Sequence, residues 1–287
     1  MMRLNIAFEK YHGCGNDFLI KDELKGRRTP DAVRSRIAKV MCDRHFSVGA
    51  DGVIFVESAR GCDGAMRLFE PAGNEADMCG NGLRCVAAFL MERLGKKEVR
   101  VMTQDGVKVV TRAGSEYTVD MGPVRTGPKH LRAYIADAGK PSVDLMKIDV
   151  PNGSRKMVGS IINTGEPHIV VRTKQLVNVR LRDIGAKVNS DRKRFPKGVN
   201  INFVELVRPG EIKVRTYERG VYDETLACGT GATASAAVSL LKGWVRKRRV
   251  KVNALGGCLT IDLPEDGRAY MTGPATKVFE GTAEVEI

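Results

Sequence analysis

The feature that most constrains the fold of this chain is a stretch that occurs twice, at residues 69–82 and at residues 217–231. Each copy has an aromatic residue followed by Glu, a turn that contains Gly, a second Glu four residues before a cysteine, and then Cys-Gly-x-Gly. Each copy continues into an apolar, alanine-rich segment. The copies lie about half of the 287 residues apart. The pattern therefore predicts a duplicated fold that delivers two matched thiols, Cys79 and Cys228.

The size and composition fit a globular protein of two domains better than one of a single domain. The chain has 43% hydrophobic and 28% charged residues, the proportions of soluble proteins. No apolar run reaches the roughly 20 residues that cross a bilayer. Residues 1–10 lack the hydrophobic region of a signal peptide. We expect a cytoplasmic protein that has no membrane partner.

The net charge of +13 raises the possibility of a polyanionic partner. The basic residues are scattered, however, and only residues 192–194 and 246–249 form dense runs. No aromatic residues alternate with them, as a single-strand binder requires. We therefore expect no nucleic-acid partner, and a basic nucleic-acid-binding protein is kept as the alternative from another functional class.

The seven cysteines are odd in number and contain no Cys-x-x-Cys pair, so a secreted disulfide framework is not expected. No His lies near Cys79 and Cys85, so a zinc site is not expected either. Cys85 fits the buried stripe of a helix. The other cysteines are interpreted as structural or incidental: Cys14, Cys42, Cys62 and Cys258.

In the first half, alternating and turn patterns predict strands at 6–11, 18–21, 52–57, 65–70, 99–103, 107–112 and 117–121. A helix is expected over 30–42, with Thr29 as its N-cap. A second helix is expected over 81–94 and ends at Gly95. Its buried stripe comprises Leu83, Val86, Ala87, Leu90 and Leu94.

The second half repeats this order after an irregular stretch at 123–144, where we place the domain boundary, between residues 124 and 125. Helices are expected over 179–189 and 231–242. Strands are expected at 156–163, 168–172, 200–207, 212–217, 251–255, 258–263, 269–271 and 277–284.

Each half is thus predicted to be a set of strands around one long central helix, with a cysteine at the N-terminus of that helix. This is a duplicated α/β (α+β) fold. A doubly wound fold is not expected, because hairpin signals dominate and βαβ alternation is absent.

A cysteine at a helix N-terminus suits proton transfer. The partial positive charge and the N–H groups there stabilise a thiolate, and they also bind carboxylates. Gly80, Gly82, Gly229 and Gly231 allow close approach to the backbone. Two such helix ends facing each other across an interdomain cleft would hold a small carboxylate between two thiols.

This arrangement favours the removal of an amino-acid α-proton. The N–H groups aimed at the carboxylate stabilise the charge that develops there. One thiolate takes the proton from one face, and one thiol returns a proton to the other. The predicted outcome is inversion at carbon, carried out by groups whose pKa can be tuned toward the operating pH.

The chain resembles the diaminopimelate epimerase family, a group of cofactor-independent amino-acid epimerases and racemases. The residues that carry the resemblance span nearly the whole chain: 11–18, 49–52, 78–85, 163–168, 198–204 and 218–231. The combination of Cys-Gly-Asn-Gly with Cys-Gly-Thr-Gly is highly specific.

The resemblance implies two pseudosymmetric domains, 1–124 and 125–275, with the active site in the cleft between them and a last strand, 276–287, that returns to the first domain. It implies no cofactor, neither pyridoxal phosphate nor a metal, and a homodimer is usual. Cys79 and Cys228 would be the acid–base pair. His168 and Glu218 would assist them in proton exchange.

The substrate contacts that the resemblance implies fall into two sets. Backbone N–H groups would bind the reacting carboxylate from Gly80, Asn81, Gly229 and Thr230. The distal amino-acid end would be held by Asn16, Asn200 and Arg219, where an arginine suits a carboxylate bidentately.

The chain departs from the family at two positions, since it has Glu70 and Glu166 where members commonly have Asn. Both positions would border the distal pocket, and two carboxylates there would favour an ammonium group. Two hypotheses follow. One is interconversion of LL-2,6-diaminopimelate and meso-diaminopimelate in lysine biosynthesis. The other is a different racemase of the same fold, independent of pyridoxal phosphate, that acts on an amino acid with a cationic side chain.

Overall fold

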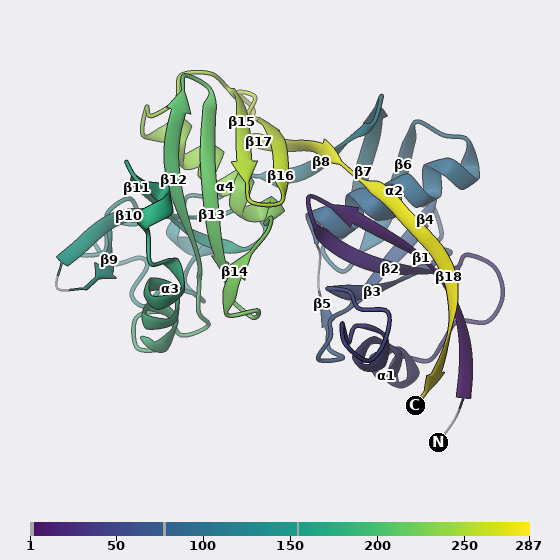
Figure 1. The fold of residues 1–287 in the computed structure, drawn as a ribbon. Helices are drawn as coiled ribbons and strands as arrows, with labels where there is room; N and C mark the ends of the chain where they lie inside the picture. Colours follow the sequence, from purple (N-terminus) through teal and green to yellow (C-terminus); the bar gives the residue numbers. More distant parts are fainter. Residues whose placement is uncertain (1–2, 77–78, 154) are drawn as a thin grey trace. The chain divides into compact units, whose positions relative to one another are not determined.

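The computed structural model describes residues 3–76, 79–153 and 155–287 (Figure 1). Asp77 and Met78 of the first repeat copy lie outside the described residues. The chain forms two compact units. The first unit is Met1–Asp120 together with Thr272–Ile287, and the second unit is Met121–Met271. The sequence had suggested boundaries at 124/125 and 275/276.

The first unit contains most of the N-terminal half and the last strand. Its elements are β1 (Arg3–Gly13), β2 (Asn16–Glu23), α1 (Asp31–Met41), β3 (Gly52–Glu57), β4 (Gly64–Phe69), β5 (Glu75–Ala76), α2 (Gly80–Leu94), β6 (Glu98–Thr103), β7 (Gly106–Ala113), β8 (Glu116–Pro123) and β18 (Thr276–Glu286). The chain passes into the second unit along β8.

The second unit follows the same order. Its elements are η1 (Pro128–His130), β9 (Ile148–Asn152), β10 (Arg155–Asn163), β11 (Pro167–Thr173), η2 (Leu176–Asn178), α3 (Leu181–Ser190), β12 (Asn200–Arg208), β13 (Glu211–Glu218), β14 (Asp223–Thr225), α4 (Gly229–Leu241), β15 (Arg249–Ala254), β16 (Gly257–Asp262) and β17 (Arg268–Pro274). The chain returns to the first unit along β17.

The strand pairing repeats from one unit to the other. The antiparallel pair β1–β2 corresponds to β10–β11, and the pairs β3–β4 and β4–β5 correspond to β12–β13 and β13–β14. The parallel pairs β2–β3 and β4–β6 correspond to β11–β12 and β13–β15. The predicted duplication thus extends over the strand framework of each unit, in a mixed, strand-rich fold.

The expectation that βαβ alternation is absent was wrong. Each α-helix of the described residues connects two parallel strands: α1 joins β2 to β3, α2 joins β4 to β6, α3 joins β11 to β12, and α4 joins β13 to β15. Parallel neighbours need such a crossover. The hairpins on either side, and the short strands β5 and β14 before α2 and α4, hide this alternation in the sequence.

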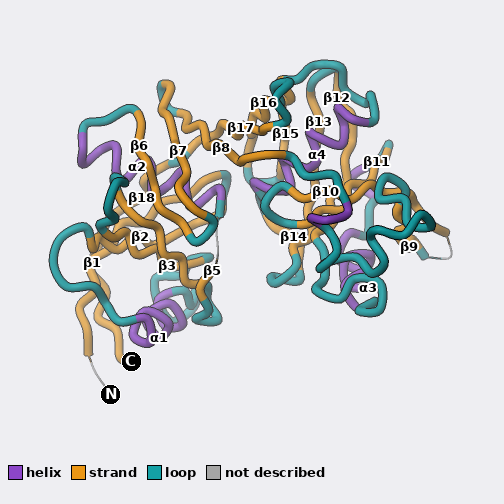
Figure 2. Tube along the Cα trace, turned by 180° about the vertical axis from the view of Figure 1, so that it is seen from behind, coloured by secondary structure: helices purple, strands orange, loops and turns teal. Residues whose placement is uncertain are grey.

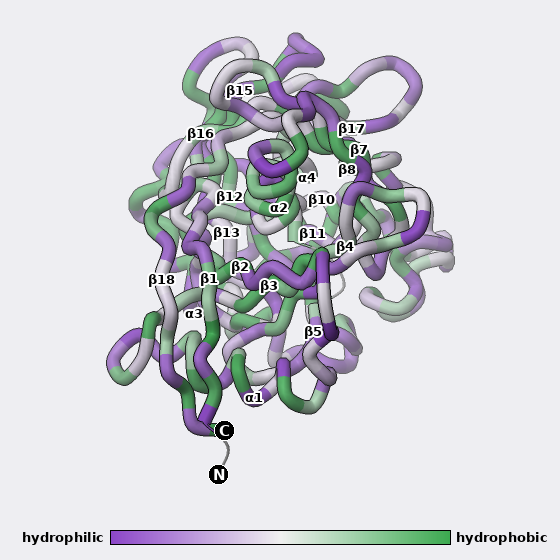
Figure 3. The backbone as a smooth tube through the Cα atoms, turned by 90° about the vertical axis from the view of Figure 1, so that its right-hand side faces the viewer, coloured by the Kyte–Doolittle hydropathy of each residue, from purple (hydrophilic) through white to green (hydrophobic). Residues whose placement is uncertain are grey.

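The two helices that follow the cysteines are the centres of their units. Helix α2 packs on β1, β2, β4, β6 and β18, and α4 packs on β10, β11, β12, β13, β15 and β16. Much of both helices is coloured hydrophobic in Figure 3. In α2 every residue from Gly80 to Met91 is buried, so the helix is enclosed on all sides and not only along a stripe. Leu94, predicted to be buried, is 43% exposed because it lies in the last turn.

Helix α1 packs on β3, β4 and β18, and helix α3 packs on β9, β12, β13 and β14 (Figure 2). The predicted cap of α1 was wrong. Pro30 occupies the N-cap position, and the hydroxyl group of Thr29 donates to Glu23 instead. Glu23 also forms an ion pair with the buried guanidinium group of Arg34. Thr29 therefore adds a hydrogen bond to this ion pair and does not cap the helix.

The chain ends meet in the first unit. Strand β18 pairs antiparallel with β1 from Thr276 opposite His12 to Glu286 opposite Arg3, which Figure 1 shows as the yellow arrow beside the purple one. Strand β9 was not expected, since Pro151-Asn152-Gly153 suggests only a turn. No helix of the described residues is long and apolar enough to cross a membrane.

Candidate active site

Each repeated cysteine is the N-cap residue of the central helix of its unit. Cys79 precedes α2 with φ −133° and ψ 117°, and Cys228 precedes α4 with φ −119° and ψ 113°. The Sγ atom of Cys79 accepts from the backbone N–H of Gly82 at 3.5 Å, and that of Cys228 accepts from Gly231 at 3.4 Å. Each sulfur atom thus lies in the field of the first helical turn, which favours the thiolate form.

The glycine in the third helical position is closely packed in both units. A Cβ atom on Gly82 would lie 3.2 Å from Cδ1 of Ile54. A Cβ atom on Gly231 would lie only 2.6 Å from Oδ1 of Asn202. Each helix start therefore rests directly on a neighbouring strand, and the side chain beneath it differs in kind between the units.

The Glu four residues before each cysteine forms an ion pair that holds neighbouring strands together. Glu75 pairs in bidentate fashion with Arg67, and Glu224 pairs in the same way with Arg215. The hydrogen bond from Arg67 holds the pKa of Glu75 below its ordinary value. These matched pairs fasten β5 to β4 and β14 to β13, just before the chain reaches the cysteines.

In the first unit, Cys79 is joined to an amide of fixed orientation. The Cys79 thiol donates to Oδ1 of Asn16 at 3.6 Å, and Nδ2 of Asn81 donates to the same oxygen at 3.1 Å. Nδ2 of Asn16 donates to the Asp51 carboxylate at 2.6 Å. The carboxylate can only accept, so the oxygen of the Asn16 amide must face the cysteine.

Asn81 is held in turn by a fully buried arginine. Nη2 of Arg84 donates to Oδ1 of Asn81 at 2.9 Å, and Nε donates to the Pro274 carbonyl at 3.1 Å. Arg84 also reaches Cys14. This role was not predicted, because an arginine inside an apolar helix resembles a surface residue in a one-dimensional pattern.

Three of the remaining cysteines are held as neutral thiols by burial. Burial raises the pKa of Cys14, and it raises the pKa values of Cys42 and Cys85 to about 12. A thiol is nucleophilic or basic only as the thiolate. These cysteines are therefore not available as bases near neutral pH.

In the second unit, a threonine hydroxyl lies between Cys228 and a histidine. Oγ1 of Thr230 is 3.4 Å from Sγ of Cys228 and 2.9 Å from Nε2 of His168. The backbone carbonyl of Thr230 accepts from Thr164 at 2.9 Å. His168 thus reaches the sulfur through the hydroxyl group of Thr230.

His168 is fully buried. Burial lowers its pKa to about 3, the charge of Arg219 acts in the same direction, and a hydrogen bond with Asn202 acts in the opposite one. The imidazole is therefore neutral at physiological pH. A neutral imidazole donates one hydrogen bond and accepts one.

The residues predicted for the distal end of the substrate form a second network in this unit. Nε of Arg219 donates to Glu166 at 2.6 Å, and the guanidinium group lies over the Tyr134 ring at 5.3 Å. The amide of Asn200 accepts from the backbone N–H of Arg219 at 2.8 Å and donates to the Pro167 carbonyl at 3.0 Å. Asn200 therefore positions the arginine.

Glu70 and Glu218 begin equivalent turns in the two units. Glu70 accepts from Asn74 four residues later, and Glu218 accepts from the hydroxyl group of Thr225. Both bonds are local to the turn. Of the predicted site residues, Asn16, Glu70, Cys79, Gly80 and Asn81 belong to the first unit, and the others belong to the second.

Several site residues were not predicted: Asp51, Arg84, Asn202, Thr216 and Thr225. One signal for Asn202 was available, because residues two apart on a strand share a face, and Asn202 follows Asn200 at that spacing. Within residues 3–76, 79–153 and 155–287, no group of three or more His, Cys, Asp or Glu side chains is arranged to hold a metal ion.

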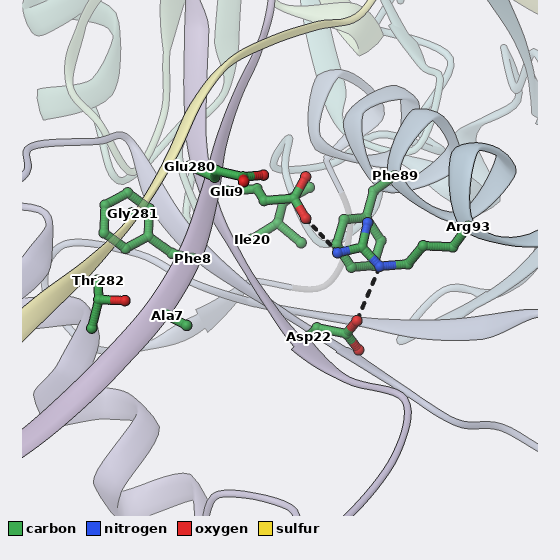
Figure 4. A pocket seen from close by; sticks show the side chains of 10 residues that line it. All are labelled: Ala7, Phe8, Glu9, Ile20, Asp22, Phe89, Arg93, Glu280, Gly281 and Thr282. Atoms are coloured by element: carbon green, nitrogen blue, oxygen red, sulfur yellow. Dashed lines mark hydrogen bonds and ion pairs between the residues drawn. The ribbon is translucent and has the colours of Figure 1, made fainter.

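A cavity of about 330 Å³ lies elsewhere in the first unit, and neither cysteine lines it (Figure 4). Arg93 crosses it between Glu9 and Asp22, with 3.0 Å from Nε to Asp22. The residues that line it include none of the candidate site residues, so this cavity is separate from the candidate site.

The family model described as "Diaminopimelate epimerase" matches residues 8–127 and 160–278. A diaminopimelate epimerase from Synechococcus elongatus is 38% identical over 98% of this chain and 99% of its own length. One from Archaeoglobus fulgidus is 38% identical over 97% of this chain and 96% of its own. The residues that the family model matches include all of the predicted site residues.

Solved structures show the same fold at low identity. A hydroxyproline epimerase from Agrobacterium vitis, with trans-4-hydroxy-L-proline bound, has a TM-score of 0.69 at 16% identity and covers 100% of this chain and 93% of its own. A phenazine biosynthesis protein of the PhzF family from Bacillus anthracis has a TM-score of 0.65 at 16% identity and covers both chains completely. On its matched cysteines, its duplicated fold and these full-length matches, the chain belongs to the diaminopimelate epimerase family.

Proposed function

We propose that this protein, an isomerase, interconverts LL-2,6-diaminopimelate and meso-diaminopimelate in lysine biosynthesis, by proton transfer at one α-carbon with two cysteines as acid and base. Membership of the family and the names of the relatives support the substrate. One observation carries the chemistry: both repeats place a cysteine at the N-cap of a buried helix, with its sulfur atom bonded to the third N–H of that helix.

In the proposed mechanism, Cys79 and Cys228 face the α-carbon from opposite sides when the two units, acting as domains, close on the substrate. The α-proton leaves to one thiolate, and the thiol of the other cysteine supplies a proton to the opposite face. Backbone N–H groups of Gly80, Asn81, Gly229 and Thr230 bind the reacting carboxylate. Their position in the first helical turns supports this role, because N–H groups there point toward the ligand.

The distal end of diaminopimelate carries both an ammonium and a carboxylate group, and the pair of Glu166 and Arg219 has the complementary charges. Arg219 would receive the carboxylate bidentately, and Glu166 would receive the ammonium group. Without substrate the two side chains neutralise each other at 2.6 Å. Asn200 holds the backbone of Arg219, and Glu70 is proposed to border the same end of the substrate.

The remaining predicted residues include neighbours of the two thiols. Asn16 is bonded to Cys79 itself, and in this proposal it holds the distal end of the substrate together with Asn200 and Arg219. His168 is neutral and acts through Thr230 rather than as a charged acid. Glu218 is proposed to assist proton exchange from the turn that it shares with Thr225.

We further propose a cytoplasmic homodimer that uses no cofactor and has no nucleic-acid or membrane partner. A reducing compartment suits the mechanism because both thiols must stay reduced. Light scattering coupled to gel filtration measures the dimer directly, and a monomer at assay concentration would contradict that part of the proposal.

The test of function is isotope exchange. The reduced protein is incubated with LL-diaminopimelate in deuterated water, and the product is analysed by chiral chromatography and mass spectrometry. We expect one deuterium at an α-carbon of the meso product. Absence of both deuterium and meso product would refute the proposal.

A panel of L- and D-amino acids tests the alternative that Glu166 selects another cationic substrate. Racemisation of lysine, arginine or ornithine, with no reaction of diaminopimelate, would favour that alternative. The opposite pattern is expected.

A further inference from the structure

The strand registers identify which residues of the two units are equivalent. Phe18 lies opposite Gly52 on the next strand, and His168 lies opposite Asn200 in the same way. One strand further, Ile54 lies opposite Leu68, and Asn202 lies opposite Thr216. Beneath the start of α2, the first unit thus has Phe18, Ile54 and Leu68. Beneath the start of α4, the second unit has His168, Asn202 and Thr216.

All six side chains are buried, so this layer is apolar in one unit and hydrogen-bonded in the other. Burying three polar side chains is unfavourable unless each finds partners. The apolar layer of the first unit shows that packing alone does not require them. The polar layer calls for an explanation in the chemistry of Cys228.

The orientation of the Asn202 amide is set by two neighbours. Its Nδ2 faces the backbone carbonyl of Ile169 at 3.3 Å, and a carbonyl can only accept. Its Oδ1 accepts from the hydroxyl group of Thr216 at 2.9 Å. With the amide oriented in this way, Nδ2 also donates to Nδ1 of His168 at 3.0 Å.

The tautomer of His168 follows from that bond. A neutral imidazole whose Nδ1 accepts must carry its proton on Nε2. Nε2–H then donates to Oγ1 of Thr230 at 2.9 Å. Asn200 lies 3.5 Å from the same nitrogen, a longer contact than the 2.9 Å to Thr230, and its Nδ2 donates to the Pro167 carbonyl at 3.0 Å.

The hydroxyl group of Thr230 is thereby left as a donor. Its oxygen accepts from His168, so its own proton is available to Sγ of Cys228 at 3.4 Å. A donated hydrogen bond favours the charged form of its acceptor. At Cys79 the bond runs the other way, because the thiol donates to a carboxamide oxygen of Asn16 at 3.6 Å, and this favours the protonated form.

We propose that Asn202 and Thr216 are positioning residues that fix His168 as its Nε2–H tautomer and thereby, through Thr230, make Cys228 the resting thiolate while Cys79 rests as the thiol. The catalytic consequence rests on the proposed function. In the direction that starts from this resting state, Cys228 takes the α-proton, forming its S–H bond as the C–H bond breaks, and Cys79 gives its S–H proton to the opposite face; in the reverse direction the two cysteines exchange these roles. Exchange with water restores the resting state.

The charges around His168 support a fixed neutral ring. Arg219 is the charged group that acts on it, and Arg219 is itself paired with Glu166. Burial and Arg219 both lower the pKa of His168, to about 3, so the imidazole does not titrate in the range where thiols do.

The first measurement reads the tautomer directly. Protein labelled with ¹⁵N in its histidines is examined by long-range ¹H–¹⁵N correlation from pH about 6 to about 9, and the His168 signals are assigned with His168→Gln. We expect a protonated Nε2 and an unprotonated Nδ1 throughout. A protonated Nδ1 in the unmodified protein would overturn the inference.

The second measurement reads each cysteine separately. Alkylation by iodoacetamide is followed against pH, and the peptides of Cys79 and Cys228 are quantified by mass spectrometry. The pH midpoint of alkylation is expected to be lower for Cys228 than for Cys79. Asn202→Ile, which installs the residue type found in the first unit, should raise the Cys228 midpoint by about one pH unit, equivalent to about tenfold less thiolate. The Cys79 midpoint should not change.

Thr216→Val and Thr216→Ser form a milder pair in case Asn202→Ile fails to fold. The valine variant should raise the Cys228 midpoint, and the serine variant, which keeps the hydroxyl group, should restore it. Leu68→Val alters the equivalent apolar position and should shift neither cysteine. Equal midpoints in the unmodified protein, or unchanged Cys228 midpoints in both Asn202→Ile and Thr216→Val, would refute the inference.

These outcomes are separable from the proposed function. If the unmodified protein fails to epimerise diaminopimelate, the substrate proposal falls, while the tautomer and the midpoints still test the inference. If it epimerises normally and the midpoints do not respond, only the inference falls.

Discussion

The two units of this protein share a framework and differ in the chemistry beneath it. Both have the same parallel and antiparallel strand pairs, a central buried helix, an N-cap cysteine and a bidentate Arg–Glu pair before that cysteine. Only the second unit places a histidine, an asparagine and a threonine under the start of its helix. The first has apolar side chains there.

This difference shows that different residues set the position of each thiol and its protonation state. The repeated framework brings each sulfur atom to the same place relative to its own helix. The layer beneath decides whether the sulfur atom is approached by a donor, as at Cys228, or donates to an acceptor, as at Cys79. A duplicated fold can therefore supply an acid and a base from identical residue types.

The largest expected effect comes from removing either thiol. Cys79→Ala and Cys228→Ala should each lower kcat for epimerisation by at least about 10³-fold, because each face of the carbon needs its own group. Cys62→Ala, a matched thiol deletion outside the repeat, should retain full activity. If Cys79→Ala or Cys228→Ala kept more than a tenth of the activity, the proposal that both thiols are needed would be contradicted.

The glycines at the third helical position should respond unequally. Gly231→Ala drives a methyl group to 2.6 Å from the Asn202 oxygen, whereas Gly82→Ala meets the end of the Ile54 side chain at 3.2 Å. Ala itself favours the helix, so any loss reports the contact. We expect about a 10²-fold loss of kcat/KM for Gly231→Ala and a smaller one for Gly82→Ala. Equal losses would indicate that the two layers are equally tolerant.

Acid should destabilise the second unit first. The pKa of His168 is about 3 in the folded protein and about 6.5 in the unfolded chain. As pH falls below about 6.5, the unfolded chain gains a proton that the folded protein does not, so stability is complete above that pH and decreases below it.

Between pH 7 and pH 5 this group should reduce the free energy of unfolding by about 2 kcal/mol. Urea unfolding at both pH values measures the change, and His168→Gln should remove about that much of it. Hydrogen exchange should accelerate first in β11 and β12. A pH dependence unaltered by His168→Gln would contradict the buried neutral state.

The last prediction tests what the two units share. Arg67→Met and Arg215→Met should each cost about 1–3 kcal/mol of stability, because each leaves a largely buried carboxylate without its partner. The control is Arg182→Met, which removes the exposed pair with Asp223 and should cost under about 1 kcal/mol. If only one of the two variants lost stability, the Arg–Glu pair would stabilise only the unit in which that variant lies.

Prediction from the sequence worked best where a pattern is local. The repeat located both cysteines, and helix periodicity with Gly95 as the αL residue gave the bounds of α2 to within one residue. It failed where the pattern depends on distant strands. Alternation of strands and helices was missed because hairpins interrupt it. Leu94 was assigned to the core because periodicity does not show where neighbouring strands end.

The sequence by itself determined the duplication, the placement of a thiol at each helix start and the family to which the chain belongs, because these are written in short contiguous motifs. The tertiary structure decided what surrounds each thiol. His168, Asn202 and Thr216 come from three strands that pair only in the fold, and the direction of a hydrogen bond depends on which donor and acceptor meet. The same motif, Cys-Gly-x-Gly, therefore gains a donor in one unit and an acceptor in the other.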